Sequence, residues 1–144
     1  MMLVIEHIPI AKARPRFANG RVYDPQLREK IKAKFELASQ MRDKRILRYQ
    51  GCDISFYLTA HMPKPKSWSK TRLKSVEGKS AGGKKDCDNI AKFYLDVLNG
   101  IAYDDDRQVS CLWCQKVYSD NPRVEIQINS IEESGIKDPR IAQQ

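Results

Sequence analysis

The stretch KKDCDNIAKFYLDVLNG, residues 84–100, predicts the helix around which the rest of the fold is organised. Apolar residues fall on both flanks of this helix, and between them Asp88, Lys92 and Asp96 recur every four residues as one polar stripe. A helix that is apolar on both sides of a polar stripe is mostly buried, so the stripe should open into a cleft. The Asn-Gly pair that closes the stretch is a common signal for the end of a helix.

Two carboxylates, Asp86 and Asp88, lie one residue apart where this helix begins. Like charges this close repel each other unless something offsets the repulsion. The candidates are Lys84 and Lys85, which come just before the aspartates, the positive N-terminal end of the helix, or a metal ion. The simplest alternative for the polar stripe is a pair of ordinary Asp–Lys helix salt bridges.

A second acidic cluster, Asp104, Asp105 and Asp106, follows shortly after the Asn-Gly turn. The chain reverses at Gly100, which can bring this cluster back towards the helix that it has just left. Carboxylate oxygens are the ligands that Mg²⁺ prefers, and a metal held in this way activates water and clamps a scissile phosphate. A lysine nearby can stabilise the charge of the transition state. The two clusters therefore favour a phosphodiester-cleaving metal site, and the alternative is a surface loop whose aspartates serve solubility.

The rest of the chain alternates strand and helix patterns. Its 144 residues fit one domain, and its 41% hydrophobic content supports a packed core. The order strand, helix, strand, loop, helix, strand, strand predicts an α+β (mixed α/β) fold, a single small domain whose mixed sheet is packed by two helices. A short Asp-Asn-Pro link favours a hairpin of the last two strands. The predicted strands are 3–10, 52–62, 107–119 and 123–133, the predicted helices are 25–48 and 86–98, and the domain spans 1–134, followed by a frayed tail at 135–144.

The net charge of +8 points to a polyanionic partner. Residues 63–85 hold eight lysines and arginines against one glutamate, together with prolines, glycines and serines. This composition predicts a long mobile basic loop. The loop is either a surface for the polyanion or a solvated linker, and it ends where the paired aspartates begin.

Several common sites are absent from the sequence. Cys111 and Cys114 have the C-x-x-C spacing of a zinc site, but Cys52 and Cys87 do not form the second pair that such a site needs. No calcium-binding loop, Walker-type glycine loop or nucleophile elbow occurs, and no small-molecule cofactor is expected. No apolar run is long enough to cross a bilayer, and the first residues lack the features of a signal peptide. We therefore expect a soluble cytoplasmic protein without a membrane partner.

Residues 84–109, KKDCDNIAKFYLDVLNGIAYDDDRQV, closely resemble the signature of the RusA family of Holliday-junction resolvases, which are crossover junction endodeoxyribonucleases. Members typically read K-P-D-x-D-N-hydrophobic-x-K, then L-D-A-L-N-G, then Y-x-D-D-x-Q. A looser similarity extends to PIAKARPRF with RVYDP near the N-terminus and to HMPKPKSWSK before the basic segment. The chain departs from the pattern at Lys85, where proline is usual.

The resemblance implies roles for individual residues of both motifs. Asp86 and Asp88 match the two metal-binding aspartates, Lys92 matches the catalytic lysine, and Asp106 matches the essential acid of the second motif. Asp105, the adjacent acid of that motif, is a further candidate metal ligand.

Two other acids receive lesser roles from the same resemblance. Asp104 falls on the variable position of the second motif. Asp96 matches a recurrent acid that we interpret as structural, paired along the helix with Lys92.

The resemblance further implies a Mg²⁺-dependent homodimer, with Mn²⁺ as a substitute, that nicks opposed strands of a four-way DNA junction symmetrically in DNA recombination and repair. Many relatives occur in phages and prophages. The alternative from another class is a non-catalytic basic protein that binds branched DNA and whose acids merely anchor the helix. The predicted phosphate contacts are Lys64, Lys66, Lys70, Arg72, Lys74, Lys84 and Lys85, with Arg14, Arg16 and Arg21 as a second strip whose alternative is a solvated turn.

A four-way junction has two-fold symmetry, and its resolution takes two nicks. One acidic set per chain gives one metal site, so paired nicks require two copies related by a two-fold axis. We expect the contact to be apolar and to use an edge strand or the exposed side of the first helix, around Phe35 and Leu37. Trp68 is a candidate wedge or anchor against DNA.

Overall fold

Strand β4 (Ile54–Pro63) is the centre of the sheet, because its alternate residues are apolar and buried and both of its edges find partners. The computed structural model describes residues 1–131. Within this range β4 pairs in parallel with β5 (Val109–Ser119) and antiparallel with β6 (Arg123–Ser130). Strand β1 (Met2–Ile5) pairs antiparallel with the other edge of β6. The order β1-β6-β4-β5 makes a mixed four-stranded sheet.

The last two strands do not pair with each other, so the predicted hairpin is wrong. Strand β4 lies between β5 and β6. The link of residues 120–122 reaches about 13 Å when extended, and this spans two strand spacings of about 4.8 Å each. A short link therefore fits both a hairpin and a crossing over one strand, and local sequence does not distinguish the two arrangements.

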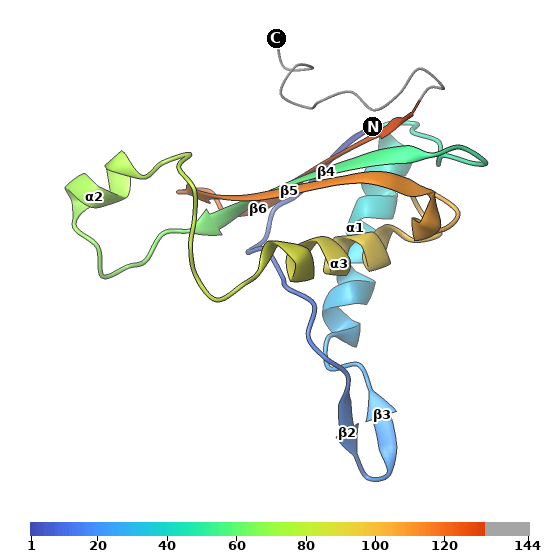
Figure 1. Ribbon diagram of the computed structural model, residues 1–144, viewed down its shortest axis with the longest axis horizontal. Coiled ribbons are helices and arrows are strands. Elements are labelled where there is room, and N and C mark those ends of the chain that lie inside the picture. Colours follow the sequence, from blue (N-terminus) through green and yellow to red (C-terminus); the bar gives the residue numbers. More distant parts are fainter. Residues whose placement is uncertain (132–144) are drawn as a thin grey trace.

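Two helices cover one face of this sheet (Figure 1). Helices α1 (Leu27–Asp43) and α3 (Cys87–Leu98) share one apolar cluster with fully buried sheet residues such as Phe56, Leu58 and Ile126. Burial of side chains of this size contributes roughly 1.5–3 kcal/mol each. The α+β fold and the two packing helices are therefore confirmed.

Helix α1 is shorter than the predicted range 25–48. The chain leaves helical geometry after Lys44, and Arg45 adopts a positive φ of 55°. Leu47, which falls within the predicted range, lies beyond the helix and is 87% exposed.

The core-facing stripe of α1 consists of Ala33, Leu37 and Met41, which recur every four residues. Leu37 is completely buried, so its predicted place on the exposed side of the helix is wrong. Phe35 is 74% exposed, as expected for that side. Two positions along the helix turn a side chain through about 200°, which separates these two residues.

The basic connection after β1 contains an unpredicted hairpin of strands β2 (Arg16–Ala18) and β3 (Arg21–Tyr23). The Asn-Gly pair between them is a turn signal in the sequence, and both Asn19 and Gly20 adopt positive φ, at 51° and 73°. Such a turn matches the twist of paired strands. Figure 1 shows the hairpin projecting away from the sheet, below α1.

The segment predicted as one basic loop contains helix α2 (Lys70–Ser75), whose N-cap Ser69 accepts a hydrogen bond from the backbone N–H of Arg72. We call residues 64–85 the basic arm. Its return towards α3 is tied to β5 by backbone hydrogen bonds from Gly78 to Tyr118, from Tyr118 to Lys79 and from Ala81 to Lys116, at 2.8–3.0 Å. The arm is therefore docked along the edge of the sheet at its base.

The tail predicted at 135–144 and the end of the predicted strand 123–133 lie outside the described residues. In the described part of the chain, no helix is both long and apolar enough to cross a membrane.

Candidate active site

The two carboxylates of the first motif stand exposed at the N-terminus of α3. Asp86 is the N-cap residue, with extended backbone (φ −79°, ψ 143°), and Asp88 lies in the first turn. An aspartate at an N-cap usually accepts a hydrogen bond from the helix backbone, but the Asp86 side chain makes no capping bond. The positive end of the helix offsets the repulsion between the two carboxylates. Both carboxylates are therefore available to a ligand outside the helix.

The backbone that carries these carboxylates is held from two sides. From β5, Lys116 Nζ donates to Lys85 O at 2.7 Å, and the Cys114 thiol donates to Cys87 O at 3.4 Å. From the segment after β1, the backbone N–H of Lys12 donates to Asn89 O at 2.9 Å. The entrance of α3 is thus a fixed platform for Asp86 and Asp88.

Lys85 completes this platform and is not a free phosphate contact. Its Nζ donates to Pro9 O at 2.6 Å, and the residue is half-buried. Burial lowers the pKa of its ammonium group below the usual value. The predicted role of Lys85 on DNA is therefore better fulfilled by its exposed neighbour Lys84.

Lys92 lies one turn along α3 from Asp88, with Nζ 3.7 Å from Asp88 Oδ2. Both side chains are more than half exposed. An ion pair of this kind contributes about 0.3–0.5 kcal/mol to a helix. The pair therefore adds little to folding and leaves the ammonium group of Lys92 beside the Asp88 carboxylate.

Asp96 does not pair with Lys92, so that interpretation is wrong. It pairs with Lys30 Nζ of α1 at 2.8 Å and with Lys12 Nζ at 3.8 Å. Burial favours the neutral acid, but the hydrogen bond and charge of Lys30 outweigh it, and the pKa of Asp96 lies below its usual value. Asp96 is structural, as expected, but its role is to fasten α3 to α1.

The second acidic cluster is built on a buried tyrosine and a short 3₁₀ helix, η1 (Asp106–Gln108). The Tyr103 hydroxyl donates to Leu95 O at 2.7 Å, which fixes the turn after α3. Asp105 caps η1 and is held by Arg107 through three hydrogen bonds of 2.9–3.2 Å. This hydrogen bonding to Arg107 lowers the pKa of Asp105.

The other two acids of the cluster differ in their surroundings. Asp104 pairs with Arg48 Nε at 3.2 Å. Asp106 begins η1 and is exposed. Asp105 caps the 3₁₀ helix and Asp104 pairs with Arg48, whereas Asp106 does neither. This suits Asp106 to the role of essential acid that the motif implies.

Gln108, which falls on the glutamine of the second motif, organises this cluster. Its Oε1 accepts from the backbone N–H groups of Asp104 and Asp105 at 2.8 and 3.1 Å, and its Nε2 donates to Cys52 O at 2.9 Å. The signal in the sequence is the Asp-x-x-Gln spacing of a capping box, which begins at Asp105.

The two acidic clusters lie at opposite ends of α3 (Figure 1). The twelve residues of α3 extend about 18 Å. Strand β5 begins next to η1 and runs back along the helix towards its N-terminus. Cys114, about five residues or about 17 Å along β5 from its start, contacts Cys87 in the first turn of α3. The reversal at Gly100 therefore does not bring the second cluster to Asp86 and Asp88 within one chain.

The fit of a metal ion follows from these positions. Among the described residues, no three His, Cys, Asp or Glu side chains are arranged to hold a metal, and the four cysteines are free. Mg²⁺, however, commonly binds through one or two carboxylates, with water and substrate phosphate as its remaining ligands. Asp86 and Asp88 are hard oxygen donors on a fixed backbone. They can therefore supply the protein ligands of such a site, with the remaining positions left to water and substrate phosphate.

A contact between Lys64 and DNA would require an exposed ammonium group. The structure instead buries the side chain of Lys64. Its side chain is 5% exposed, and Nζ lies 2.5 Å from Glu77 and 2.9 Å from Asp120. Burial opposes the charge of this lysine, but the two carboxylates outweigh it and raise the pKa. Lys64 joins the arm to the turn after β5.

Trp68 is an anchor of the arm. Its ring packs edge-on against Tyr118 at 5.4 Å between centroids, and the Arg72 guanidinium lies 3.8 Å from its ring centre. These contacts hold Trp68 between Arg72 of the arm and Tyr118 of β5, and they do not favour Trp68 as a wedge. Exposed cations remain on the arm at Lys66, Lys70, Lys74 and Lys84, and on the hairpin segment at Arg14, Arg16 and Arg21.

Comparison with known proteins agrees with the motifs. The family described as Endodeoxyribonuclease RusA matches residues 6–129, which include both acidic clusters and the basic arm. The chain is also similar to the uncharacterized protein YqaN of Bacillus subtilis (strain 168), with 33% identity over 135 residues that cover 85% of this chain and 91% of the relative. The chain therefore belongs to the RusA endodeoxyribonuclease family.

Proposed function

We propose that this protein is a Mg²⁺-dependent, structure-selective endodeoxyribonuclease that resolves four-way DNA junctions by paired symmetric nicks in recombination and repair. Mn²⁺ is the expected substitute metal, and the cytoplasm is the expected compartment. The observation that carries the proposal is the fixed, exposed carboxylate pair of Asp86 and Asp88, with Lys92 beside it, in a chain of this family.

The chemistry assigned to each group follows from its position. Asp86 and Asp88 would hold the metal, which when bound neutralises phosphate charge and activates water. The N-terminus of α3 favours a phosphate at the same place, because its backbone N–H groups carry partial positive charge. Lys92 is exposed one turn away and stabilises the negative charge that develops at the scissile phosphate.

The position of Asp106 supports a homodimer with shared sites. One chain holds the two parts of the site at opposite ends of α3, about 18 Å apart. With a two-fold axis beside α3, the N-terminus of α3 in one protomer would lie next to the C-terminal end of α3 in its partner. Asp86 and Asp88 of one protomer would then face Asp106 of the other. Two complete sites result, one for each nick.

The second candidate is a non-catalytic protein that binds branched DNA. It is favoured by one observation, that the described part of a single chain contains no complete metal cluster. In this reading, the ion pair between Asp88 and Lys92 only supports the helix.

Cleavage of synthetic DNA separates the two candidates. Purified protein is incubated with a four-way junction, a flap, a splayed arm and a duplex, each with Mg²⁺ and with EDTA. The nuclease is expected to nick opposed strands of the junction symmetrically with Mg²⁺, and to bind without cutting in EDTA. Binding without cleavage of any substrate under both conditions would leave only the non-catalytic candidate.

We expect the basic arm to contact the DNA backbone. Replacement of Lys66, Lys70 and Lys74 by serine should weaken binding to every DNA shape. Each phosphate contact adds about 0.9 to the slope of log K against log salt, so the loss of three contacts should lower this slope by up to about 2.7. Fluorescence anisotropy with labelled junction and duplex, over a range of salt, measures the change.

The matched control removes the same charge elsewhere. Arg42, Lys44 and Arg45 are exposed around the end of α1 and are replaced by Ser, Ser and Asn, the last because Arg45 has positive φ. This variant should keep the wild-type salt slope. Equal slopes for the arm variant and the control would place the DNA path away from the arm.

A further inference from the structure

The β2–β3 hairpin sorts two kinds of side chain onto its two sides. Phe17 opposes Val22 across the strands, and Arg16 opposes Tyr23. Successive side chains of a strand point to opposite sides, so Phe17 and Val22 share one side and the residues before and after them share the other. Phe17 is 73% exposed and Val22 is 70% exposed. The hairpin therefore has an apolar side and a second side that carries Arg16 and Arg21.

Within the described residues the hairpin is uncovered. All six residues of its strands are exposed, and the two strands form a sheet separate from the four-stranded one. It projects from the body of the fold (Figure 1). A two-stranded hairpin without cover is at best marginally stable in water. A ligand that covers Phe17 and Val22 would bury a cross-strand pair and thereby stabilise the hairpin.

The charge of this segment indicates the chemical class of the ligand. From residue 7 to residue 23 the chain has four lysines and arginines and no aspartate or glutamate. Three of these cations, Arg14, Arg16 and Arg21, are exposed. A surface of one positive sign attracts a polyanion and repels another basic protein. Proteins that bind single-stranded nucleic acid combine cations along the backbone with aromatic rings on which bases stack, and the hairpin carries both.

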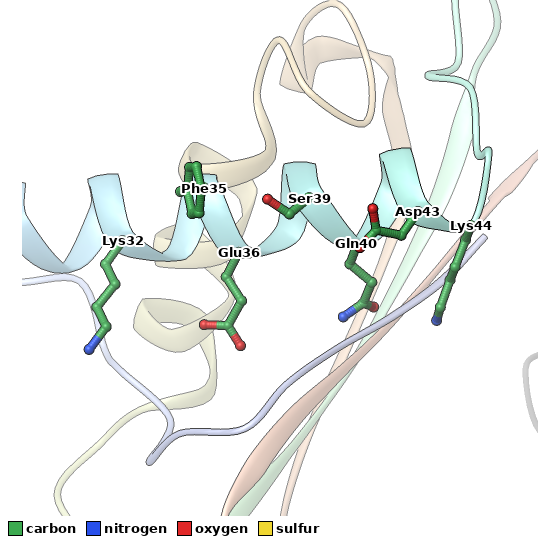
Figure 2. Close-up of a pocket in the computed structure, with 7 residues that line it drawn as sticks. All are labelled: Lys32, Phe35, Glu36, Ser39, Gln40, Asp43 and Lys44. Carbon is green, nitrogen blue, oxygen red and sulfur yellow. The ribbon is translucent and has the colours of Figure 1, made fainter.

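Phe17 fits a contact with bases better than two other aromatic residues. The ring of Trp68 is held between Arg72 and Tyr118. Phe35 is as exposed as Phe17, at 74%, but the charged residues of its groove on α1 are two lysines, one glutamate and one aspartate (Figure 2). That groove has no net charge to attract a phosphate backbone. Phe17 alone of the three combines exposure of its ring with purely cationic charged neighbours in sequence.

The base of the hairpin is fixed close to the carboxylate pair. Gln26 Oε1 accepts a hydrogen bond from the backbone N–H of Ala13 at 2.9 Å. The backbone N–H of Lys12 donates to Asn89 O, near the start of α3, at 2.9 Å. Phe17 follows Lys12 by five residues, so it lies at most about 18 Å from this point. Because bases of one strand rise by about 3.4 Å each, the contact of Phe17 falls within about five base pairs of the cut.

We propose that the β2–β3 hairpin is a base-contacting element: Phe17, with Val22 beside it, stacks on bases left open at a DNA branch point, while Arg16 and Arg21 contact phosphates from the other side. Inside a duplex arm each base is covered by its neighbours, so this contact selects branched DNA. The inference rests on the branched-DNA substrate of the proposed function. It is tested by binding in EDTA, so a protein that binds junctions in this way and cuts none would refute the nuclease and leave the role of the hairpin in place.

The test compares DNA shapes with the variant Phe17→Ser. Loss of a stacking ring should weaken binding to a four-way junction and a splayed arm at least about 10-fold and change duplex binding by no more than about 2-fold. The matched control is Leu47→Ser, which removes another exposed apolar side chain, at 87%, and should leave both affinities unchanged. Fluorescence anisotropy in EDTA measures the dissociation constants. The variant Phe17→Tyr keeps the ring and should bind as the wild type does, which separates stacking from folding of the hairpin.

The two sides of the hairpin should give different results. Replacement of Arg16 and Arg21 by serine should weaken junction and duplex binding alike and lower the slope of log K against log salt by up to about 1.8. A junction that carries 5-iodouracil at the branch point should crosslink on irradiation to the tryptic peptide of residues 17–21, which begins at Phe17.

Three outcomes would overturn the inference. The first is an equal loss of junction and duplex binding in Phe17→Ser, and the second is a crosslink confined to other peptides. The third is a Phe17→Ser protein that keeps the wild-type preference for junctions but dissociates from dimer to monomer in light scattering, because a second copy and not DNA would then cover the apolar side.

Discussion

Replacing Asp88 or Asp86 by asparagine should abolish junction cleavage, with a loss of about 100-fold or more, while junction binding stays intact or becomes tighter. Each substitution removes a hard anionic ligand, so metal affinity falls, and it also removes a negative charge near the phosphate. Folding should be unaffected, because Asp86 makes no capping bond and Asp88 has one exposed ion pair. Single-turnover cleavage, junction binding in EDTA and thermal melting measure the three effects.

Asp104→Asn is the matched control for this result. Asp104 is an exposed aspartate of the second cluster, and its partner is Arg48. The variant should cut at close to the wild-type rate, since an exposed ion pair contributes at most about 1 kcal/mol. If Asp88→Asn also cut at the wild-type rate, Asp88 would have no place in the site, and the role that the family motif implies would not hold for this chain.

Mixing two inactive variants should restore cleavage. Asp88→Asn and Asp106→Asn are each expected to be inactive, because each damages both sites of a homodimer. In a mixed dimer with shared sites, one site combines both substitutions, whereas the other receives Asp88 and Asp106 from different protomers and is intact. Random exchange of protomers makes half of the dimers mixed, so about one quarter of the wild-type sites should return. The product should be a junction nicked on one strand.

The control mixes Asp88→Asn with Asp86→Asn. These residues share one end of α3, so every site of every mixed dimer keeps one substitution and no cleavage should return. The assay follows nicking of each labelled strand after co-refolding the two variants. An absence of rescue in the first mixture, together with wild-type dimer formation, would mean that each site is built within one chain and that η1 moves towards the start of α3.

The sequence by itself determined the two long helices and the strands of the main sheet, and it singled out the residues of the first motif. The apolar flanks of 86–98 gave α3, and the Asn-Gly turns at residues 19–20 and 99–100 correctly marked chain reversals. These features are local, because helical period and turn conformation depend on residues a few positions apart. The family motif identified Asp86, Asp88, Lys92 and Asp106, and the structure leaves all four exposed.

Only the tertiary structure decided which residues meet. It inserted β4 between β5 and β6, it buried Lys64 against Glu77 and Asp120, and it paired Asp96 with Lys30 of another helix. It also set Asp106 at the far end of α3, because β5 runs antiparallel to that helix. Strand order and ion pairing depend on contacts between residues far apart in the chain, where many arrangements satisfy the same local pattern and the packing of the whole core selects one of them.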